Sequence, residues 1–170
     1  MPGSIVLVGP MGAGKSTVGR LLASRLGLGF VDTDSVIEER TGADIPWIFD
    51  VEGEEGFRQR ETNVLRDLIN DNSTLVIATG GGIVTRSENL PLLQSLGTVF
   101  YLKASIDQLV ARTSKDKKRP LLQVDDPKAK IKELVAARSP LYESAAHATI
   151  MTDARGAKGV VQQICKYLEQ

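Results

Sequence analysis

The sequence predicts an α/β domain in which a sheet of parallel strands lies between layers of helices. Short apolar runs rich in β-branched residues recur along the chain, and longer stretches with helical spacing separate them. Strands buried on both faces consist of such runs, and alternating strands and helices form parallel crossovers. With 170 residues, 42% of them hydrophobic, the chain has the size and composition of one folded unit. We therefore expect a single domain over residues 1–170.

The predicted elements can be placed along the chain. The apolar runs predict strands at residues 4–8, 29–31, 75–78, 98–102 and 148–151. The stretches with helical spacing predict helices at residues 15–26, 34–41, 55–69, 88–96, 106–113, 127–146 and 157–168. Residues 43–56 break this rhythm, because they contain Pro46, Trp47 and two glycines but no strand. We interpret them as an inserted helical cap in which Trp47 packs, and we expect His147 to be a structural or surface residue and not a catalyst.

The charge composition argues against nucleic acid and membranes as partners. The 21 basic and 21 acidic residues give a formal net charge of +0, so a polyanion would be attracted only to a local site. No apolar stretch approaches the length of a membrane span, and no basic leader precedes the first apolar run. The single cysteine, Cys165, falls in an apolar helical run and is expected to be a packing thiol. We expect a cytoplasmic protein.

A glycine-rich loop between the first strand and the first helix is the strongest motif. Residues 9–16 read G-P-M-G-A-G-K-S and fit the pattern G-x-x-x-x-G-K-[ST]. Glycines let successive amide groups point into one concavity at a helix N-terminus, which binds phosphate. Lys15 would bridge the β- and γ-phosphates, and Ser16 offers a hard oxygen ligand for Mg²⁺. The predicted nucleotide contacts here are Gly12, Ala13, Gly14, Lys15, Ser16 and Thr17.

The loop alone does not distinguish a kinase from a GTPase switch or a mechanical ATPase, because all three classes share it. Residues 113–116 read T-S-K-D, which lacks the spacing of the guanine-reading pattern N-K-x-D. Nothing in the sequence resembles the long arms of a motor. ATP and a small acceptor are therefore the favoured substrates.

Two carboxylates follow the second predicted strand. Asp32 and Asp34 would lie at the carboxyl edge of the sheet, where ligands of open parallel sheets bind. If Asp34 already begins the next helix, the two side chains diverge, and one can serve a metal ion while the other serves an acceptor hydroxyl. The alternative is that Asp32 or Thr33 only caps that helix.

Three more features could hold an acceptor or its phosphate. Gly80, Gly81 and Gly82 follow the third strand and indicate close approach of the backbone to a ligand. Arg58 and Glu61 lie three apart on a predicted helix, so the carboxylate could orient the guanidinium towards an anionic substrate, or the two could form a surface salt bridge. The basic run at 112–119 is typical of a solvated face or of a lid over phosphate.

Taken together, these motifs resemble the shikimate kinase family. The match comprises G-P-M-G-A-G-K-S-T at 9–17, D-T-D at 32–34, F-R-x-x-E at 57–61, G-G-G at 80–82, R-P-L-L at 119–122 and R-x-P-x-Y at 138–142. They span nearly the whole chain in family order. The resemblance implies a three-layer P-loop kinase fold with strand order 2-3-1-4-5. It also implies a substrate-binding region at about 33–61 and a lid at about 112–125.

The resemblance further implies a reaction and a set of site residues. ATP would donate its γ-phosphoryl group to the 3-hydroxyl of shikimate, giving shikimate 3-phosphate and ADP in aromatic amino-acid biosynthesis. Lys15, Asp34 and Arg119 would be catalytic, and Arg112, Arg119 and Arg155 would contact the nucleotide. One Mg²⁺ per subunit would be held by Ser16 and, through water, by Asp32. The implied acceptor-binding residues are Asp34, Phe49, Phe57, Arg58, Glu61, Gly80, Gly81, Gly82 and Arg138.

The expected partners are the two small substrates, bound by a monomer. Three other functions remain open on the residues alone. A gluconate kinase would share the phosphate loop and lid but not the combination of triple glycine, Arg58 and Arg138. A nucleoside monophosphate kinase would bring pockets for a second base and phosphate. A nucleotide-dependent regulatory module would have lost the transfer chemistry, although Lys15, Asp34 and Arg119 are all present.

Overall fold

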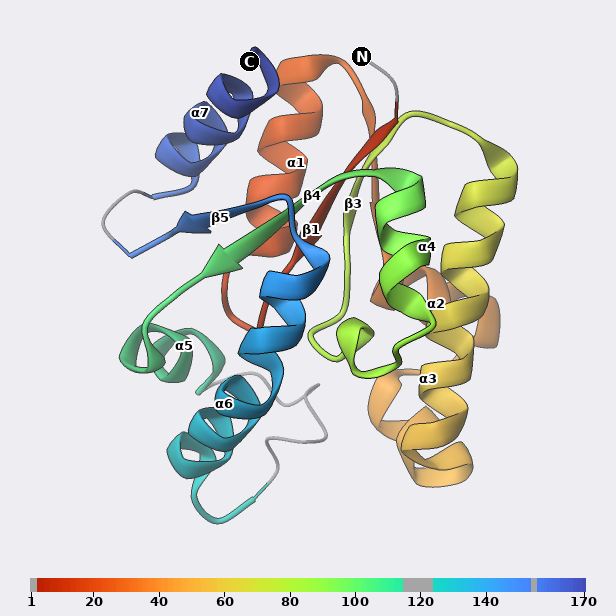
Figure 1. Cartoon of the computed structure of the whole chain (residues 1–170). Helices are drawn as coiled ribbons and strands as arrows, with labels where there is room; N and C mark the ends of the chain where they lie inside the picture. The colour runs from red at the N-terminus through yellow and green to blue at the C-terminus, as the bar shows by residue number, and fades with distance from the viewer. Residues whose placement is uncertain (1–2, 115–123, 154–155) are drawn as a thin grey trace.

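Parallel strands form one sheet in the order β2-β3-β1-β4-β5, with helices on both faces (Figure 1). This computed structural model describes residues 3–114, 124–153 and 156–170. The strand order and the three layers agree with those implied by the sequence motifs. The strands are β1 (Ser4–Val8), β2 (Gly29–Asp32), β3 (Leu75–Ala78), β4 (Gly97–Lys103) and β5 (Ala148–Met151).

The helices divide between the two faces of the sheet and its carboxyl edge. The bounds are α1 (Lys15–Leu26), α2 (Thr33–Thr41), α3 (Ile45–Asp71), α4 (Asn89–Leu96), α5 (Ile106–Thr113), α6 (Pro127–Ala145) and α7 (Ala157–Leu168), with a short 3-10 turn η1 at Ile83–Thr85. Helices α1 and α7 pack against each other on one face, and α3, α4 and α6 cover the other (Figure 1). Among the described residues, none of the helices has the length and apolar character needed to span a membrane.

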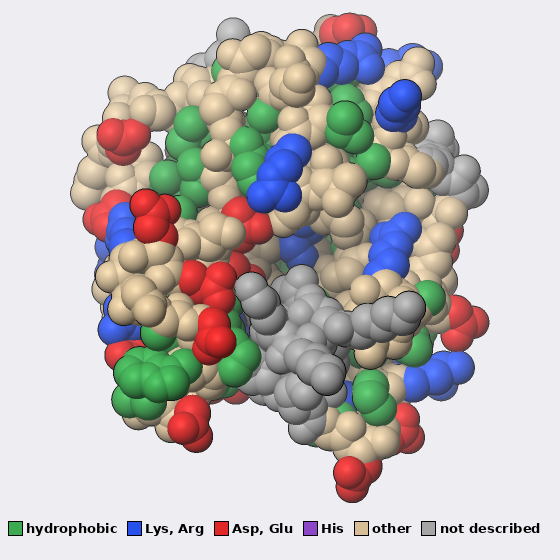
Figure 2. Space-filling model, turned by 180° about the vertical axis from the view of Figure 1, so that it is seen from behind, with side chains coloured by type: hydrophobic (Ala, Val, Ile, Leu, Met, Phe, Trp, Pro, Cys, Tyr) green, Lys and Arg blue, Asp and Glu red, His purple; other side chains and the backbone are tan. Residues whose placement is uncertain are grey.

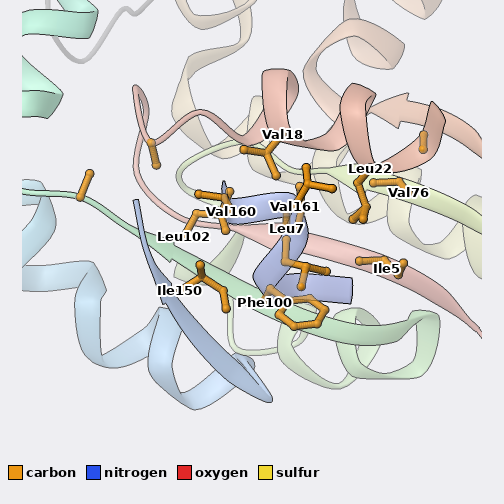
Figure 3. Close-up of a cluster of buried hydrophobic side chains, with 14 of the residues drawn as sticks. Ile5, Leu7, Val18, Leu22, Val76, Phe100, Leu102, Ile150, Val160 and Val161 are labelled. Carbon is orange, nitrogen blue, oxygen red and sulfur yellow. The ribbon is translucent and has the colours of Figure 1, made fainter. Parts of the chain in front are cut away.

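Alternating side chains of the strands build a core on each face. Ile5 and Leu7 of β1 meet Val18 and Leu22 of α1 in one cluster, to which α7 adds Val160 and neighbouring residues (Figure 3). Val6 and Val8 of the same strand join the second cluster, under α3, α4 and α6. This alternation follows from the two-residue period of a strand. Cys165 is buried in the first cluster as a free thiol, as expected.

The predicted cap at residues 43–56 is helical, and a kink separates most of it from the long remainder of the helix. Helix α3 runs from Ile45 to Asp71 and includes it, with a kink at Gly53, where φ is 74° and ψ is 176°. Only glycine adopts this conformation readily, so the kink at Gly53 interrupts the helical backbone and sets the cap off from the rest of α3. The packing expected of Trp47 was wrong, because the residue is 55% exposed. Ile45 and Ile48 face the core, and Trp47 lies between them on the outer side.

His147 has a structural role. Its backbone N–H donates to the carbonyl of Val99, and its Nδ1 accepts a hydrogen bond of 2.9 Å from the Val99 N–H. The imidazole thereby satisfies a backbone donor of β4 that would otherwise be buried without an acceptor.

Candidate active site

The register of the sheet brings three loops to one edge. Ala78, the last residue of β3, pairs with Asp32 of β2 on one side and with Leu7 of β1 on the other. The segments that follow these strands therefore begin side by side at the carboxyl edge, where open parallel sheets bind ligands. The glycine-rich loop, the D-T-D segment and the triple glycine all lie there.

A cavity of about 440 Å³ opens among these loops. The face seen in Figure 2 is hollowed near its centre, with basic side chains deep in the hollow and acidic side chains along one side. Phosphate-loop residues line the cavity together with carboxylates from α2, so groups suited to phosphate and groups suited to a hydroxyl share one space. The lining residues are Met11, Gly12, Gly14, Lys15, Ser16, Thr17, Asp32, Asp34, Ser35, Glu38, Ile45, Thr79, Gly81 and Arg112.

The phosphate loop is held by its glycines. Gly9 passes so close to β4 that a Cβ there would lie 2.6 Å from the carbonyl oxygen of Leu102. Gly14 has a φ of 94° and ends the loop immediately before α1 begins at Lys15. The Lys15 ammonium lies in the loop, donating to the carbonyls of Gly9 and Pro10 at 2.5 and 2.9 Å. The loop therefore presents a cation and a helix N-terminus to the cavity.

A second pocket of about 250 Å³ lies behind the loop and includes Ala13, Gly14, Thr17 and Arg112. The Arg112 guanidinium donates to the Gly12 carbonyl at 2.9 Å and lines both pockets. The predicted nucleotide residues of the phosphate loop, and Arg112, thus meet at one place. Arg119 and Arg155 lie outside the described residues, as does most of the expected lid at 112–125, of which only 112–114 and 124–125 are described.

Asp32 caps α2, and the same carboxylate also contacts the phosphate loop. Its Oδ1 accepts hydrogen bonds from the N–H groups of Asp34 and Ser35, so it caps α2. Its Oδ2 accepts a hydrogen bond of 2.6 Å from the Ser16 hydroxyl at the start of α1. Because one carboxylate has two oxygens, capping does not exclude a contact in the cavity. The result is a pair of hard oxygen atoms at the edge of the phosphate loop.

Asp34 faces a different neighbour from Asp32, as expected if it lies inside the helix. It is the second residue of α2, and a Cβ on Gly80 would lie 2.7 Å from its Oδ1. The same Cβ would lie 2.8 Å from Oε2 of Glu61. Gly80 therefore lets two carboxyl groups from different helices approach one backbone atom, and any side chain there would displace them.

Arg58 and Glu61 form a buried ion pair. The Arg58 residue is 6% exposed and Glu61 is fully buried, with 2.8 Å between Nη1 and Oε1. The surface salt bridge that the sequence left open is thereby excluded. A Cβ on Gly82 would lie 2.5 Å from Cζ of Arg58, so the guanidinium packs on the bare glycine. Arg138, also buried, approaches the next glycine, with Nη1 3.8 Å from the Cβ position of Gly81.

The charges in this cluster shift one another's protonation. Burial raises the pKa of Glu61 to about 7, a shift that the Coulombic effect of Asp34 reinforces and that attraction to Arg58 and Arg138 only partly offsets. Burial alone would lower the pKa of Arg58, but the carboxylates of Glu61 and Glu54 outweigh it and raise this pKa. Arg58 is therefore a fixed cation, whereas Glu61 titrates near neutral pH.

Phe49 and Phe57 stack with ring centroids 4.9 Å apart, and Phe57 is buried in a small cluster with Ile37, Ile45 and Ile48. Neither ring lines the cavity described above. Their role as apolar walls for an acceptor stays a prediction. Phe57 does support the basic cluster, because the Arg58 guanidinium lies 5.4 Å from its ring centroid.

Two residues of this region were missed in the sequence. Glu38 lines the cavity, and its Oε2 accepts a hydrogen bond from the Ile45 N–H that begins α3. The Thr33 hydroxyl is buried and accepts a hydrogen bond of 3.1 Å from the Gly80 N–H. The spacing of four between Asp34 and Glu38 on one helix was the available signal for Glu38. For Thr33 the sequence held no signal of this contact beyond its place in the D-T-D motif.

The phosphate loop at the end of the central strand shares its cavity with Asp34, whereas Arg58 and Arg138 do not line that cavity and are buried against the neighbouring triple glycine. This arrangement defines a phosphotransferase of the P-loop kinase class. Residues 11–169 match the model of the shikimate kinase family. A shikimate kinase of Vibrio parahaemolyticus is 56% identical over 98% of this chain and 96% of the relative. The chain belongs to the shikimate kinase family.

Solved structures support the same family assignment. The shikimate kinase of Acinetobacter baumannii in complex with shikimate superimposes with a TM-score of 0.96 at 48% identity, covering 99% of this chain and 94% of that one. A gluconokinase of Sinorhizobium meliloti reaches a TM-score of only 0.56 at 17% identity, over 99% of this chain and 96% of that chain. The gluconokinase therefore shares the fold alone.

Replacing Glu61 by glutamine should remove a pH-dependent loss of stability. A carboxyl whose pKa is about 7 when folded and 4.5 when unfolded binds more protons in the folded state between these values, so the free energy of unfolding falls as pH rises through them. At pH 5 the two proteins should be similarly stable, and at pH 8 Glu61→Gln should be more stable by about 1–3 kcal/mol. Urea unfolding at both pH values measures this, and parallel pH profiles would contradict the raised pKa.

Proposed function

We propose that the residues around this cavity bind ATP and shikimate side by side and hold the acceptor hydroxyl in line with the γ-phosphate. As a member of the shikimate kinase family, the chain is an ATP-dependent kinase. It transfers the γ-phosphoryl group to the 3-hydroxyl of shikimate, giving shikimate 3-phosphate and ADP. The observation that carries the division of roles is that one cavity is lined both by the phosphate loop and by Asp34.

On the donor side, Lys15 and the phosphate-loop amides neutralise the β- and γ-phosphates. The Lys15 ammonium already lies against the loop carbonyls, so it has to shift only locally to reach a phosphate oxygen. Arg112 lies between the two pockets and contacts the nucleotide beyond the phosphates. Arg119 of the lid and Arg155 complete the donor site in this proposal. Positive charge around the transferred group is what a loose transition state requires.

On the acceptor side, Asp34 accepts a hydrogen bond from the 3-hydroxyl and takes its proton as the O–P bond forms. Arg58 and Arg138 pair with the shikimate carboxylate, and Glu61 holds Arg58 in place through the 2.8 Å ion pair. Gly80, Gly81 and Gly82 bring the backbone close to the ring, and Phe49 and Phe57 supply its apolar walls. Burial of both arginines makes each contact with an anion strong, because little water competes.

The donor set at the edge of the phosphate loop fits Mg²⁺. Ser16 and Asp32 place a hydroxyl and a carboxylate oxygen 2.6 Å apart, and Mg²⁺ prefers such oxygen ligands while keeping several waters. Ser16 would hold the ion directly and Asp32 through water. When bound, the ion supplies charge neutralisation for the β- and γ-phosphate oxygens.

The enzyme acts as a monomer in the cytoplasm in this proposal. The use of ATP as co-substrate supports a cytoplasmic site of action.

Release of ADP from Mg-ATP tests the substrate assignment. The reaction is run with shikimate, with gluconate and with no acceptor, and Lys15→Ala serves as the blank. Release should depend on shikimate, because only an acceptor with a carboxylate and a correctly placed hydroxyl satisfies both arginines and Asp34. Comparable release with gluconate, or with no acceptor at all, would overturn the assignment.

Asp34→Asn should lower turnover at least about tenfold while leaving ATP affinity nearly unchanged, because the amide cannot accept the hydroxyl proton. Steady-state ADP release at saturating shikimate gives the turnover, and titration with a nucleotide analogue gives the affinity. Ser35→Ala is the matched control, because Ser35 follows Asp34 in the sequence and also lines the cavity. Near-normal turnover of Asp34→Asn would remove its proposed role.

Arg58→Ala or Arg138→Ala should weaken shikimate binding by roughly 2 kcal/mol or more through loss of a charge-assisted contact. Arg60→Ala is the matched control, since Arg60 lies on the same helix in an exposed ion pair with Glu52. Shikimate affinity is measured by calorimetry with each variant. If neither buried-arginine variant differs from Arg60→Ala, the carboxylate assignment is wrong.

A further inference from the structure

Side-chain hydroxyls from two helices hold the triple-glycine loop. Thr33 of α2 accepts the Gly80 N–H, and Tyr142 of α6 donates its hydroxyl to the Gly81 carbonyl at 2.5 Å. The other two carbonyls of the loop accept hydrogen bonds from the turn that follows it. The Gly80 carbonyl accepts from the Ile83 N–H, and the Gly82 carbonyl accepts from the Thr85 N–H. Among the hydrogen bonds of the described residues, the one from Tyr142 is the only one that joins α6 to the backbone of the three glycines.

Three successive glycines need such an external restraint. Without Cβ atoms they have more backbone freedom than any other sequence, and a side chain at Gly82 would collide with the Arg58 guanidinium. The peptide group is planar and trans, so its N–H points opposite to its C=O. Fixing the Gly81 carbonyl towards Tyr142 therefore also fixes the direction of the Gly82 N–H.

Arg138 approaches the same glycine. It lies one turn before Tyr142 on α6, its Nη1 is 3.8 Å from the Cβ position of Gly81, and its charge acts on the Tyr142 phenol. Tyr142 is fully buried, and burial raises its pKa to about 12, so the hydroxyl stays protonated and can donate to Gly81. Its ring packs on Tyr101 with centroids 5.0 Å apart, which holds the phenol in one orientation. One side chain thereby links a guanidinium to a backbone peptide.

We propose that Tyr142 is a positioning residue for the acceptor: its hydroxyl fixes the Gly81–Gly82 peptide and the Arg138 guanidinium relative to each other, without touching the substrate. The inference rests on the proposed role of Arg138 in binding the acceptor carboxylate. It assigns a function to the last residue of the R-x-P-x-Y motif. It predicts that removing one buried oxygen atom affects recognition of the acceptor and spares the nucleotide.

Tyr142→Phe tests the inference, with Tyr101→Phe as the matched control. Tyr101 is equally buried and stacks on Tyr142, but its hydroxyl pairs with Ser139 at 3.2 Å instead of the glycine loop. Tyr142→Phe should raise the KM for shikimate about tenfold, because it leaves the part-buried Gly81 carbonyl without its hydroxyl donor and frees Arg138. The KM for ATP should stay within about twofold of wild type in both variants, and Tyr101→Phe should keep the wild-type KM for shikimate.

Calorimetric titration with shikimate, and a thermal melt of each variant, accompany the kinetics. An unchanged KM for shikimate in Tyr142→Phe overturns the inference, and so does an equal rise in Tyr101→Phe or an equal rise in the KM for ATP, since these indicate general loosening of the fold. If Arg138→Ala loses shikimate affinity and Tyr142→Phe does not, only this inference fails. If Arg138→Ala keeps its affinity, the proposed function of Arg138 fails, and this inference with it.

Discussion

Parallel pairing of β1, β2 and β3 in a single register is the constraint on which the site depends. Because Asp32, Ala78 and Leu7 lie in one row, the segments that leave these strands are forced together at one edge of the sheet. The side chains of the site therefore start from backbone positions that already lie close together. The two hydrophobic clusters on the faces of the sheet fix that register, since a shift of one residue would turn Ile5 and Leu7 away from α1 and α7.

Three buried charged residues of this neutral chain lie in one cluster. Arg58, Glu61 and Arg138 are each at least nine-tenths buried, and they surround the triple glycine with Asp34 beside them. Burial of isolated charges is costly, and pairing only partly offsets it. The raised pKa of Glu61 reflects that cost. An anionic acceptor would add a further negative partner for the arginines, so the site is arranged for a ligand and not for maximum stability.

The glycines connect the donor and acceptor parts of the site. Gly9 and Gly14 shape the phosphate loop, whereas Gly80 and Gly82 make room for Asp34, Glu61 and Arg58. A fold shared with a gluconokinase at 17% identity does not set the acceptor by itself. What differs within such a fold is which side chains occupy the edge beside the third strand, and here they are carboxylates and arginines from α2, α3 and α6.

Much of this protein could be read from the sequence because its signals are local. The phosphate loop, the strands and most helices follow from spacing over a few residues, and the motif resemblance supplied the strand order. The helix predicted at 34–41 put Asp34 at its start, although the sequence left open whether its side chain diverges from that of Asp32. These features depend on chain geometry that neighbouring residues determine.

Only the tertiary structure decided the rest, because burial and contact depend on residues far apart in the chain. In the sequence, the spacing of Arg58 and Glu61 is the same as that of an exposed ion pair on a helix. Their burial comes from the glycines that follow β3, on which they pack. Trp47 faces outward because Ile45 and Ile48 take the inner positions of the same turn. Tyr142 meets Gly81 across 61 residues of chain, through packing that no short pattern records.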